Sequence, residues 1–203
     1  MTTDYLRGQA LIDAIQNAPY SRDLVGYHGQ APVVQWPHQA RIAIQFVLNY
    51  EEGAENHVEH GDAGSEQFLS DIIGAQSFPE RHMSMDSMYD YGSRAGFWRI
   101  HDEFQKRALP MTIFGVGMAL ARNPYIVEAI RQANYDVVSH GQRWLNYQNI
   151  DLATERQHMD QAISVLEALF GQTPMGWYTG RDSPRTRQLL AEFPQIQYDC
   201  DYY

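Results

Sequence analysis

The clearest pattern of hydrophobic and polar positions lies in residues 41–53. Ile42, Ala43, Ile44, Phe46, Val47 and Leu48 form a nearly continuous apolar run, which predicts a strand at residues 41–49 that is buried on both faces. Glu51, Glu52 and Gly53 then interrupt the run. In folds built from β-α units, ligands bind at the carboxyl ends of the strands, so the two carboxylates are a candidate site. The alternative is that both glutamates simply face solvent after a strand.

Strand-like and helix-like segments alternate along the rest of the chain. An amphipathic helix is expected first, at residues 4–17, whereas residues 68–88 carry methionines that are spaced too irregularly for a helix. Asp151 and Gly171 are typical of the start and the end of a helix. We expect further strands at 111–116, 136–139, 176–178 and 197–200, helices at 93–107, 124–133, 151–170 and 183–193, and a turn or short helix at 117–122.

This alternation predicts an α/β fold made of parallel β-α units. Right-handed connections turn such units into a doubly wound sheet or a barrel, and a complete barrel usually needs ~250 residues. With 203 residues, we expect an irregular (β/α) barrel that is either small or without its last strands. The chain should form one domain over residues 1–203, with an irregular lead-in at 1–40 and the β/α units at 41–203.

Composition limits the possible partners and the cellular location. The formal net charge of -10 argues against a nucleic-acid or anionic-membrane partner, because both attract basic surfaces. No apolar run approaches the ~20 residues of a membrane span, and the first eight residues lack the apolar core of a signal peptide. Cys200 is the sole cysteine, which excludes an internal disulfide. We therefore expect a cytoplasmic location.

Three predicted strands end in residues that could perform chemistry. The first ends at Glu51 and Glu52, the second at His140, and the third at Tyr178 and Arg181. In a parallel sheet these ends lie on one face. Carboxylates, an imidazole and arginines together could activate water against an amide carbonyl, stabilise the oxyanion and protonate the leaving nitrogen. The alternative for His140 is a structural role with its ring bonded to the backbone.

Two stretches resemble motifs of the polysaccharide deacetylase (NodB-type) superfamily. Residues 49–53, Asn-Tyr-Glu-Glu-Gly, match its Thr-Phe-Asp-Asp-Gly, and residues 140–144 match its His-Ser/Thr-x-x-His, except for the last position. The resemblance implies that Glu51 is the base, and that Glu52 and His140 stand where metal ligands stand. Trp144 replaces the second metal histidine. Since indole cannot ligate a metal and catalytic zinc normally has three protein ligands, we expect no metal and no other cofactor.

One branch of this superfamily, the metal-independent bacterial allantoinases, is similar over more of the chain. The similarity implies hydrolysis of the ring amide of allantoin, a small neutral substrate. In that reaction Glu51 or Glu52 would activate water, and His140 would orient it or protonate the leaving nitrogen. Arg94, Arg143 or Arg181 would stabilise the oxyanion, and Tyr178 and Trp144 would form an apolar wall. The resembling segments are residues 23–27, 46–53, 91–96, 139–141, 143–144 and 176–181.

Three other interpretations stay open. The first is a metal-dependent N-deacetylase acting on a sugar polymer, and the second is a hydrolase of another cyclic imide or amide. The third is an inactive, truncated chain, because members of the branch extend further at the C-terminus. An open barrel would expose strand edges, so we expect a homo-oligomer.

Single residues also have plain structural interpretations. One arginine usually forms a surface ion pair rather than a substrate contact. The histidines and glutamates of residues 55–60 could form a small metal cluster, but a uniformly polar segment is more typical of a solvated loop. We interpret these residues as a loop.

Overall fold

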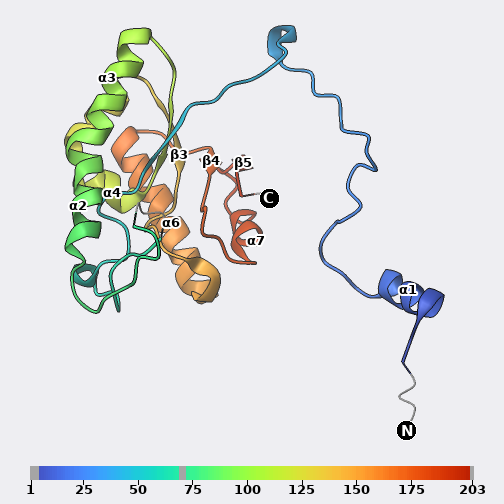
Figure 1. Cartoon of the computed structure of the whole chain (residues 1–203). Coiled ribbons are helices and arrows are strands. Elements are labelled where there is room, and N and C mark those ends of the chain that lie inside the picture. Colours follow the sequence, from blue (N-terminus) through green and yellow to red (C-terminus); the bar gives the residue numbers. More distant parts are fainter. Residues whose placement is uncertain (1–4, 69–71, 202–203) are drawn as a thin grey trace. The chain divides into compact units, whose positions relative to one another are not determined.

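The computed structural model describes residues 5–68 and 72–201, which form two compact units (Figure 1). The first unit ends at Ile44 and contains α1 (Gly8–Asn17) and the 3-10 turn η1 (Pro37–Gln39). Its described residues are exposed. Helix α1 confirms most of the helix predicted at 4–17, although residue 4 lies outside the described part. The second unit, from Gln45 onward, contains every strand that the structure describes.

Five parallel strands form one sheet in the second unit. Their order in the sheet is their order in the chain, so each described strand pairs with its sequence neighbours. This confirms an α/β fold with a parallel sheet. Sequential order is that of a barrel, whereas a doubly wound sheet reverses direction at a switch point. The strands are β1 (Val47–Tyr50), β2 (Thr112–Gly115), β3 (Asp136–Ser139), β4 (Gly176–Trp177) and β5 (Tyr198–Asp199).

Helices connect the strands, and local signals explain several of their ends. The Asp151 carboxylate accepts the Thr154 amide at the start of α6, and Gly171 adopts the left-handed conformation that ends it. The Asn123 side chain caps α5 in the same way. The helices are α2 (Met83–Tyr91), the π-turn η3 (Gly92–Gly96), α3 (Phe97–Arg107), α4 (Gly117–Arg122), α5 (Pro124–Gln132), α6 (Leu152–Phe170), α7 (Thr186–Leu190), and the 3-10 turns η2 (Val58–His60) and η4 (Tyr147–Asn149). Among the described residues, none of the helices could cross a membrane.

The core of the second unit lies where these helices cover the sheet. One cluster contains Ile113 of β2 with Leu120, Ile126 and Ile130 from α4 and α5. A second cluster contains Trp177 of β4 together with apolar residues of α6 and α7. Because burial of apolar surface is the main stabilising term, these clusters hold the strand ends in place.

The first predicted strand is longer than the observed one. Pairing starts at Val47, opposite Thr112, the first residue of β2. Ile42 and Ile44 are 69% and 70% exposed, so the prediction that residues 41–46 are buried on both faces was wrong. They precede the paired part of the strand, although the Phe46 ring already contacts Phe104 of α3 with centroids 5.2 Å apart.

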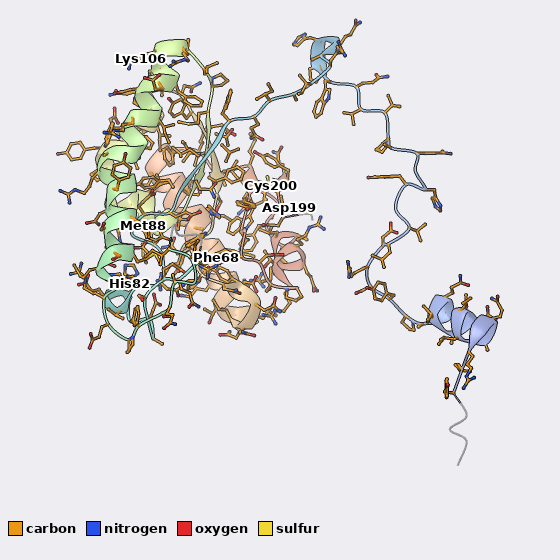
Figure 2. All side chains as sticks on the ribbon, viewed as in Figure 1. Phe68, His82, Met88, Lys106, Asp199 and Cys200 are labelled. Carbon is orange, nitrogen blue, oxygen red and sulfur yellow. The ribbon has the colours of Figure 1, made fainter. Side chains whose placement is uncertain are left out.

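The helix expected at 93–107 begins ten residues earlier. It starts at Met83, where His82 accepts the Met85 amide, and it continues without a break through η3 into α3. Figure 2 shows His82 and Lys106 near its two ends. The predicted start at residue 93 therefore lies inside this helical run, and the irregularly spaced methionines belong to a helix, contrary to the prediction. Met85 is buried, so packing decides helix formation where the spacing of apolar residues does not.

Ile113 offers a direct test of this core, because its side chain is fully buried at the centre of the first cluster. We expect Ile113→Ala to lower the free energy of unfolding by about 2–5 kcal/mol, since it leaves a cavity. Ile73→Ala is the control, because Ile73 is fully exposed and should change that free energy by less than about 0.5 kcal/mol. Urea unfolding followed by far-UV circular dichroism measures both, and equal effects would contradict this description of the core.

Candidate active site

The carboxyl ends of β1, β3 and β4 bring three predicted residues together. Glu51, His140 and Tyr178 each directly follow the last residue of their strand. The sheet register places Tyr50, Gly115, Ser139 and Trp177 in one row, so the residues that follow them share the next row. In that row the Nε2 atom of His140 lies 3.0 Å from the Oε1 atom of Glu51.

Both ring nitrogens of His140 have partners. Nδ1 lies 2.7 Å from the carbonyl oxygen of Tyr178, and a carbonyl can only accept, so Nδ1 carries a hydrogen. In a neutral ring Nε2 would then be an acceptor facing a carboxylate, which is also an acceptor. The contact between Nε2 and Glu51 therefore needs one shared proton, carried by either the imidazole or the carboxyl group. Such a pair can both take up and release a proton.

Aromatic rings pack against the His140 member of this pair. The Tyr178 ring stacks on the His140 ring with centroids 5.0 Å apart and an interplanar angle of 22°. Phe114 of β2 contacts Tyr178, with centroids 4.9 Å apart. The His140 side chain is 1% exposed and that of Glu51 14%, so Glu51 is the member of the pair that solvent can reach. Asn49 donates to the same Glu51 oxygen at 3.1 Å and helps to orient it.

Glu52 does not join Glu51 at His140. Its Oε2 atom accepts the backbone amide of Glu51 at 2.9 Å, and its carboxylate lies directly against Gly92 of the π-turn, where any larger side chain would collide with it. Burial raises the pKa of Glu52 to about 7, and the charges of Glu51 and Glu55 add to this. Burial of the side chain raises this pKa more than the two neighbouring charges do.

Arg143 donates its hydrogen bonds to the loop that follows β1. Its Nη1 atom donates to Asp62 at 2.9 Å, and its Nη2 atom donates to the Glu55 carbonyl oxygen, also at 2.9 Å. The guanidinium and the Asp62 carboxylate form a two-pronged ion pair. Burial by itself would raise the pKa of Asp62, but the hydrogen bond from Arg143 and that arginine's charge lower it. Arg143 therefore shapes this loop.

Arg181 is also paired with groups of the protein itself. Its Nη1 atom donates to the buried carboxylate of Glu66 at 3.0 Å and to the Trp144 carbonyl oxygen at 3.3 Å. Its guanidinium lies 4.5 Å from the Trp144 ring centroid and 5.0 Å from that of Phe68, the distances of cation-π contacts. Burial would raise the pKa of Glu66, but Arg181 and hydrogen bonds from Asn56, Gln67 and Phe68 lower it.

Trp144 and Arg94 lie elsewhere than we expected. Trp144 is 2% exposed and packs against Phe68 and Tyr89, so it forms part of the core and no open wall with Tyr178. Arg94 lies on the π-turn with its side chain 79% exposed, 3.9 Å from Asp90. The exposed side chain contacts no residue of the Glu51–His140 pair, and a role of Arg94 at the oxyanion stays a prediction.

Asp201 is a residue of this site that sequence analysis missed. Its buried carboxylate accepts the amides of Thr179 at 2.6 Å and Gly180 at 2.8 Å. It thereby fixes the turn after β4, which also supplies the carbonyl that orients His140. Burial raises the pKa of Asp201. Asp201 directly follows the predicted fifth strand. The rule that functional residues lie at the carboxyl ends of strands located Glu51 and His140, and it could also have indicated Asp201.

The polar segment after β1 is a loop with a short 3-10 turn, as expected, but part of it is buried rather than solvated. Glu55 and His57 are buried, and the η2 turn follows them. His57 faces Asp86 of α2 at 3.3 Å, while His60 lies 3.1 Å from the Glu55 carbonyl oxygen. These contacts attach the loop to the helical run, and they could not be read from its polar composition.

The residues present do not fit a catalytic metal ion. The two nitrogens of His140 are taken by Tyr178 and Glu51, Glu52 points toward Gly92, and the remaining position holds the indole of Trp144. Within residues 5–68 and 72–201, no three histidine, cysteine or carboxylate side chains gather closely enough to hold a metal. We therefore derive no catalytic step through a metal.

Two comparisons with known proteins show the family to which this chain is similar. The family model "Polysaccharide deacetylase" matches residues 79–198. A "Putative polysaccharide deacetylase" of Schizosaccharomyces pombe is 37% identical over 198 residues, which are 90% of this chain and 62% of that protein.

Two solved structures are more similar in sequence. A structure described as "Puue Allantoinase" is 51% identical, with a TM-score of 0.87 over 92% of this chain. A "probable Polysaccharide deacetylase" from Pseudomonas aeruginosa PAO1 is also 51% identical, with a TM-score of 0.86 over 91% of this chain. This chain spans 62% of the length of each of these proteins.

The buried carboxyl of Glu52 makes stability depend on pH. Its pKa is about 7 in the folded protein and near 4.5 when it is unfolded, so the folded state binds the extra proton between these values. Stability that this group contributes is therefore lost as pH rises from about 4.5 to about 7. Glutamine does not titrate, so Glu52→Gln lacks this loss. We expect the free energy of unfolding of Glu52→Gln minus that of wild type to be roughly 2 kcal/mol larger at pH 8 than at pH 5.

Urea titrations at the two pH values measure this difference. Glu80→Gln, at an exposed position, is the matched control and should follow wild type at both. A Glu52→Gln variant that also follows wild type would show that Glu52 titrates normally.

Proposed function

The chain belongs to the polysaccharide deacetylase family, and from this we propose that it is a hydrolase that opens the ring amide of allantoin. The observation that carries the proposal is the Glu51–His140 pair, which shares one proton and lies at the carboxyl ends of the strands. The structure described as "Puue Allantoinase", at 51% identity, supports this substrate. The polysaccharide deacetylase names of two relatives support hydrolysis in general.

The pair can supply both proton transfers that amide hydrolysis needs. In the ionised form, the Glu51 carboxylate takes a proton from water as the water oxygen bonds to the carbonyl carbon. The His140 imidazolium then gives its Nε2 proton to the ring nitrogen, and the C–N bond breaks. The product gains a carboxyl group and an N–H group. The proton that Glu51 took from water then passes to Nε2 of His140, which restores the starting form. General acid-base catalysis of this kind typically contributes 10²–10⁴-fold.

The surroundings suit a small neutral substrate. Tyr178 presents an aromatic ring beside His140, and carboxylates dominate the loop after β1. Amide and ureido N–H groups are donors that carboxylates can accept, whereas a negatively charged ligand would meet repulsion. A related cyclic imide or amide offers the same groups and remains the nearest alternative substrate class. We also retain a homo-oligomer as a proposal, because β1 and β5 each have one neighbour among the described strands.

The first test removes each member of the pair. In the full-length protein we expect Glu51→Gln and His140→Ala to lower kcat on allantoin at least roughly 10²-fold, because each loses one proton transfer. Allantoate formation measures the rate, and Glu80→Gln at an exposed position should keep the wild-type rate. If both variants hydrolyse allantoin at nearly the wild-type rate, the roles of Glu51 and His140 are wrong.

The second test separates this proposal from a metal-dependent N-deacetylase acting on a sugar polymer. We expect dialysis against a chelator to leave the rate on allantoin unchanged, because the donor set around His140 does not fit a metal. Metal analysis before and after dialysis accompanies the assay. A rate that falls and returns on addition of zinc would favour the deacetylase instead.

A further inference from the structure

The peptide group that joins Tyr178 to Thr179 connects two ionisable side chains. Its carbonyl oxygen, on Tyr178, accepts the Nδ1–H of His140 over 2.7 Å. Its amide, on Thr179, donates to Oδ2 of Asp201 over 2.6 Å. Because one peptide unit is conjugated, a carboxylate that accepts from its N–H makes its carbonyl oxygen a stronger acceptor. Asp201 and His140 are therefore coupled through a single planar group.

We propose that Asp201 acts on His140 through this peptide group and is a positioning residue of the reaction. The row of hydrogen bonds runs from Asp201 to the peptide group, then to Nδ1 of His140, and from Nε2 to Glu51. It holds the imidazole with Nε2 facing Glu51, where the proposed proton transfers take place. This inference rests on the proposed function and assigns a further residue to it.

The surroundings of Asp201 suit a charged carboxylate. The residue is 3% exposed, and each carboxylate oxygen accepts one backbone amide, Oδ2 that of Thr179 and Oδ1 that of Gly180 at 2.8 Å. Bonds this short are typical of a charged acceptor. Burial raises the pKa of Asp201, whereas the bonds from both amides and from the Thr179 side chain lower it. The amides therefore favour the ionised form.

Other hydrogen bonds hold the same turn, so its shape does not depend on Asp201 alone. Nε1 of Trp177 donates to the Thr179 hydroxyl oxygen over 2.7 Å. The Cys200 amide donates to the Trp177 carbonyl oxygen over 2.9 Å and ties β5 to β4. Removal of the Asp201 charge should therefore weaken the link to His140 more than it disturbs the turn.

The charge of Asp201 also favours one form of the Glu51–His140 pair. His140 lies between two carboxylates along the row of hydrogen bonds, and opposite charges nearby favour a protonated imidazole. The rings of Phe114 and Tyr178, which pack on His140 from β2 and from the end of β4, carry no charge that would oppose this. The proposed reaction starts from this form, with an ionised Glu51. Asp201 therefore favours the reactive form.

The test is Asp201→Asn in the full-length protein, which removes the charge and leaves one acceptor oxygen. We expect kcat on allantoin to fall roughly 10-fold with KM changed much less, because the weakened bond affects the proton transfers and not substrate binding. An NMR spectrum of protein with isotope-labelled histidine should show the Nδ1–H signal of His140, assigned by its loss in His140→Ala. Asp201→Asn should move this signal upfield, because the hydrogen bond is weaker.

Asp199→Asn is the matched control. Asp199 lies two residues earlier, and its carboxylate contacts Arg187 and the Asp201 amide, for which asparagine keeps an acceptor oxygen. It should keep the wild-type kcat and the wild-type His140 signal. Asp201→Glu and Asp201→Gln form a second pair, matched in size, for the case that Asp201→Asn does not fold. The glutamate variant should retain the higher kcat.

The possible results are distinguishable. A wild-type spectrum without a hydrogen on Nδ1 of His140 overturns the inference before any variant is made. A wild type that does not open allantoin overturns the proposed function, while a moved His140 signal in Asp201→Asn would still support the coupling. An active wild type whose kcat is unchanged in Asp201→Asn overturns the role of Asp201, whatever the melting temperature. Equal changes in Asp199→Asn would contradict the inference as well.

Discussion

One shared proton between Glu51 and His140 is the interaction on which the candidate site depends. The Tyr178 carbonyl requires a hydrogen on Nδ1, and the short contact of Nε2 with Glu51 then requires another. Three strands must end in register for this to occur. Backbone hydrogen bonds from Val116 to Tyr50, from His140 to Gly115 and from Tyr178 to Ser139 extend the sheet by one row and fix that register. The apolar clusters below the row hold the strands in place.

The two adjacent glutamates show how one position along the chain changes a carboxylate. Glu51 directly follows β1, whereas Glu52 lies in the turn closed by the hydrogen bond from the Ala54 amide to the Glu51 carbonyl oxygen. Glu51 therefore faces His140, while Glu52 faces the helical run and is buried against Gly92. The π-turn at Gly92–Gly96 provides a position without a side chain at this contact. Such turns are frequent at functional sites, and here the turn makes room for a buried acid whose pKa is about 7.

Ion pairs organise the loop after β1 and thereby limit what the arginines can do. Arg143 with Asp62 and Arg181 with Glu66 attach this loop to the segments after β3 and β4. Both guanidinium groups are largely buried, so breaking either pair would leave an uncompensated charge. The arginines therefore support the site by fixing the loop that follows β1. Asp201 supports it from β5 by holding the turn that orients His140.

Local sequence determined which residues end the strands and where several helices begin and stop. The strand at 136–139, the caps Asp151 and Gly171, and the positions of Glu51, His140 and Tyr178 follow from periodicity and from neighbours a few residues apart. Only the tertiary structure decided the partners of Arg143 and Arg181 and the burial of Trp144. Arg143 and Asp62 are 81 residues apart, and Arg181 and Glu66 are 115 apart. Such pairings depend on how separate elements pack, and no local pattern encodes them.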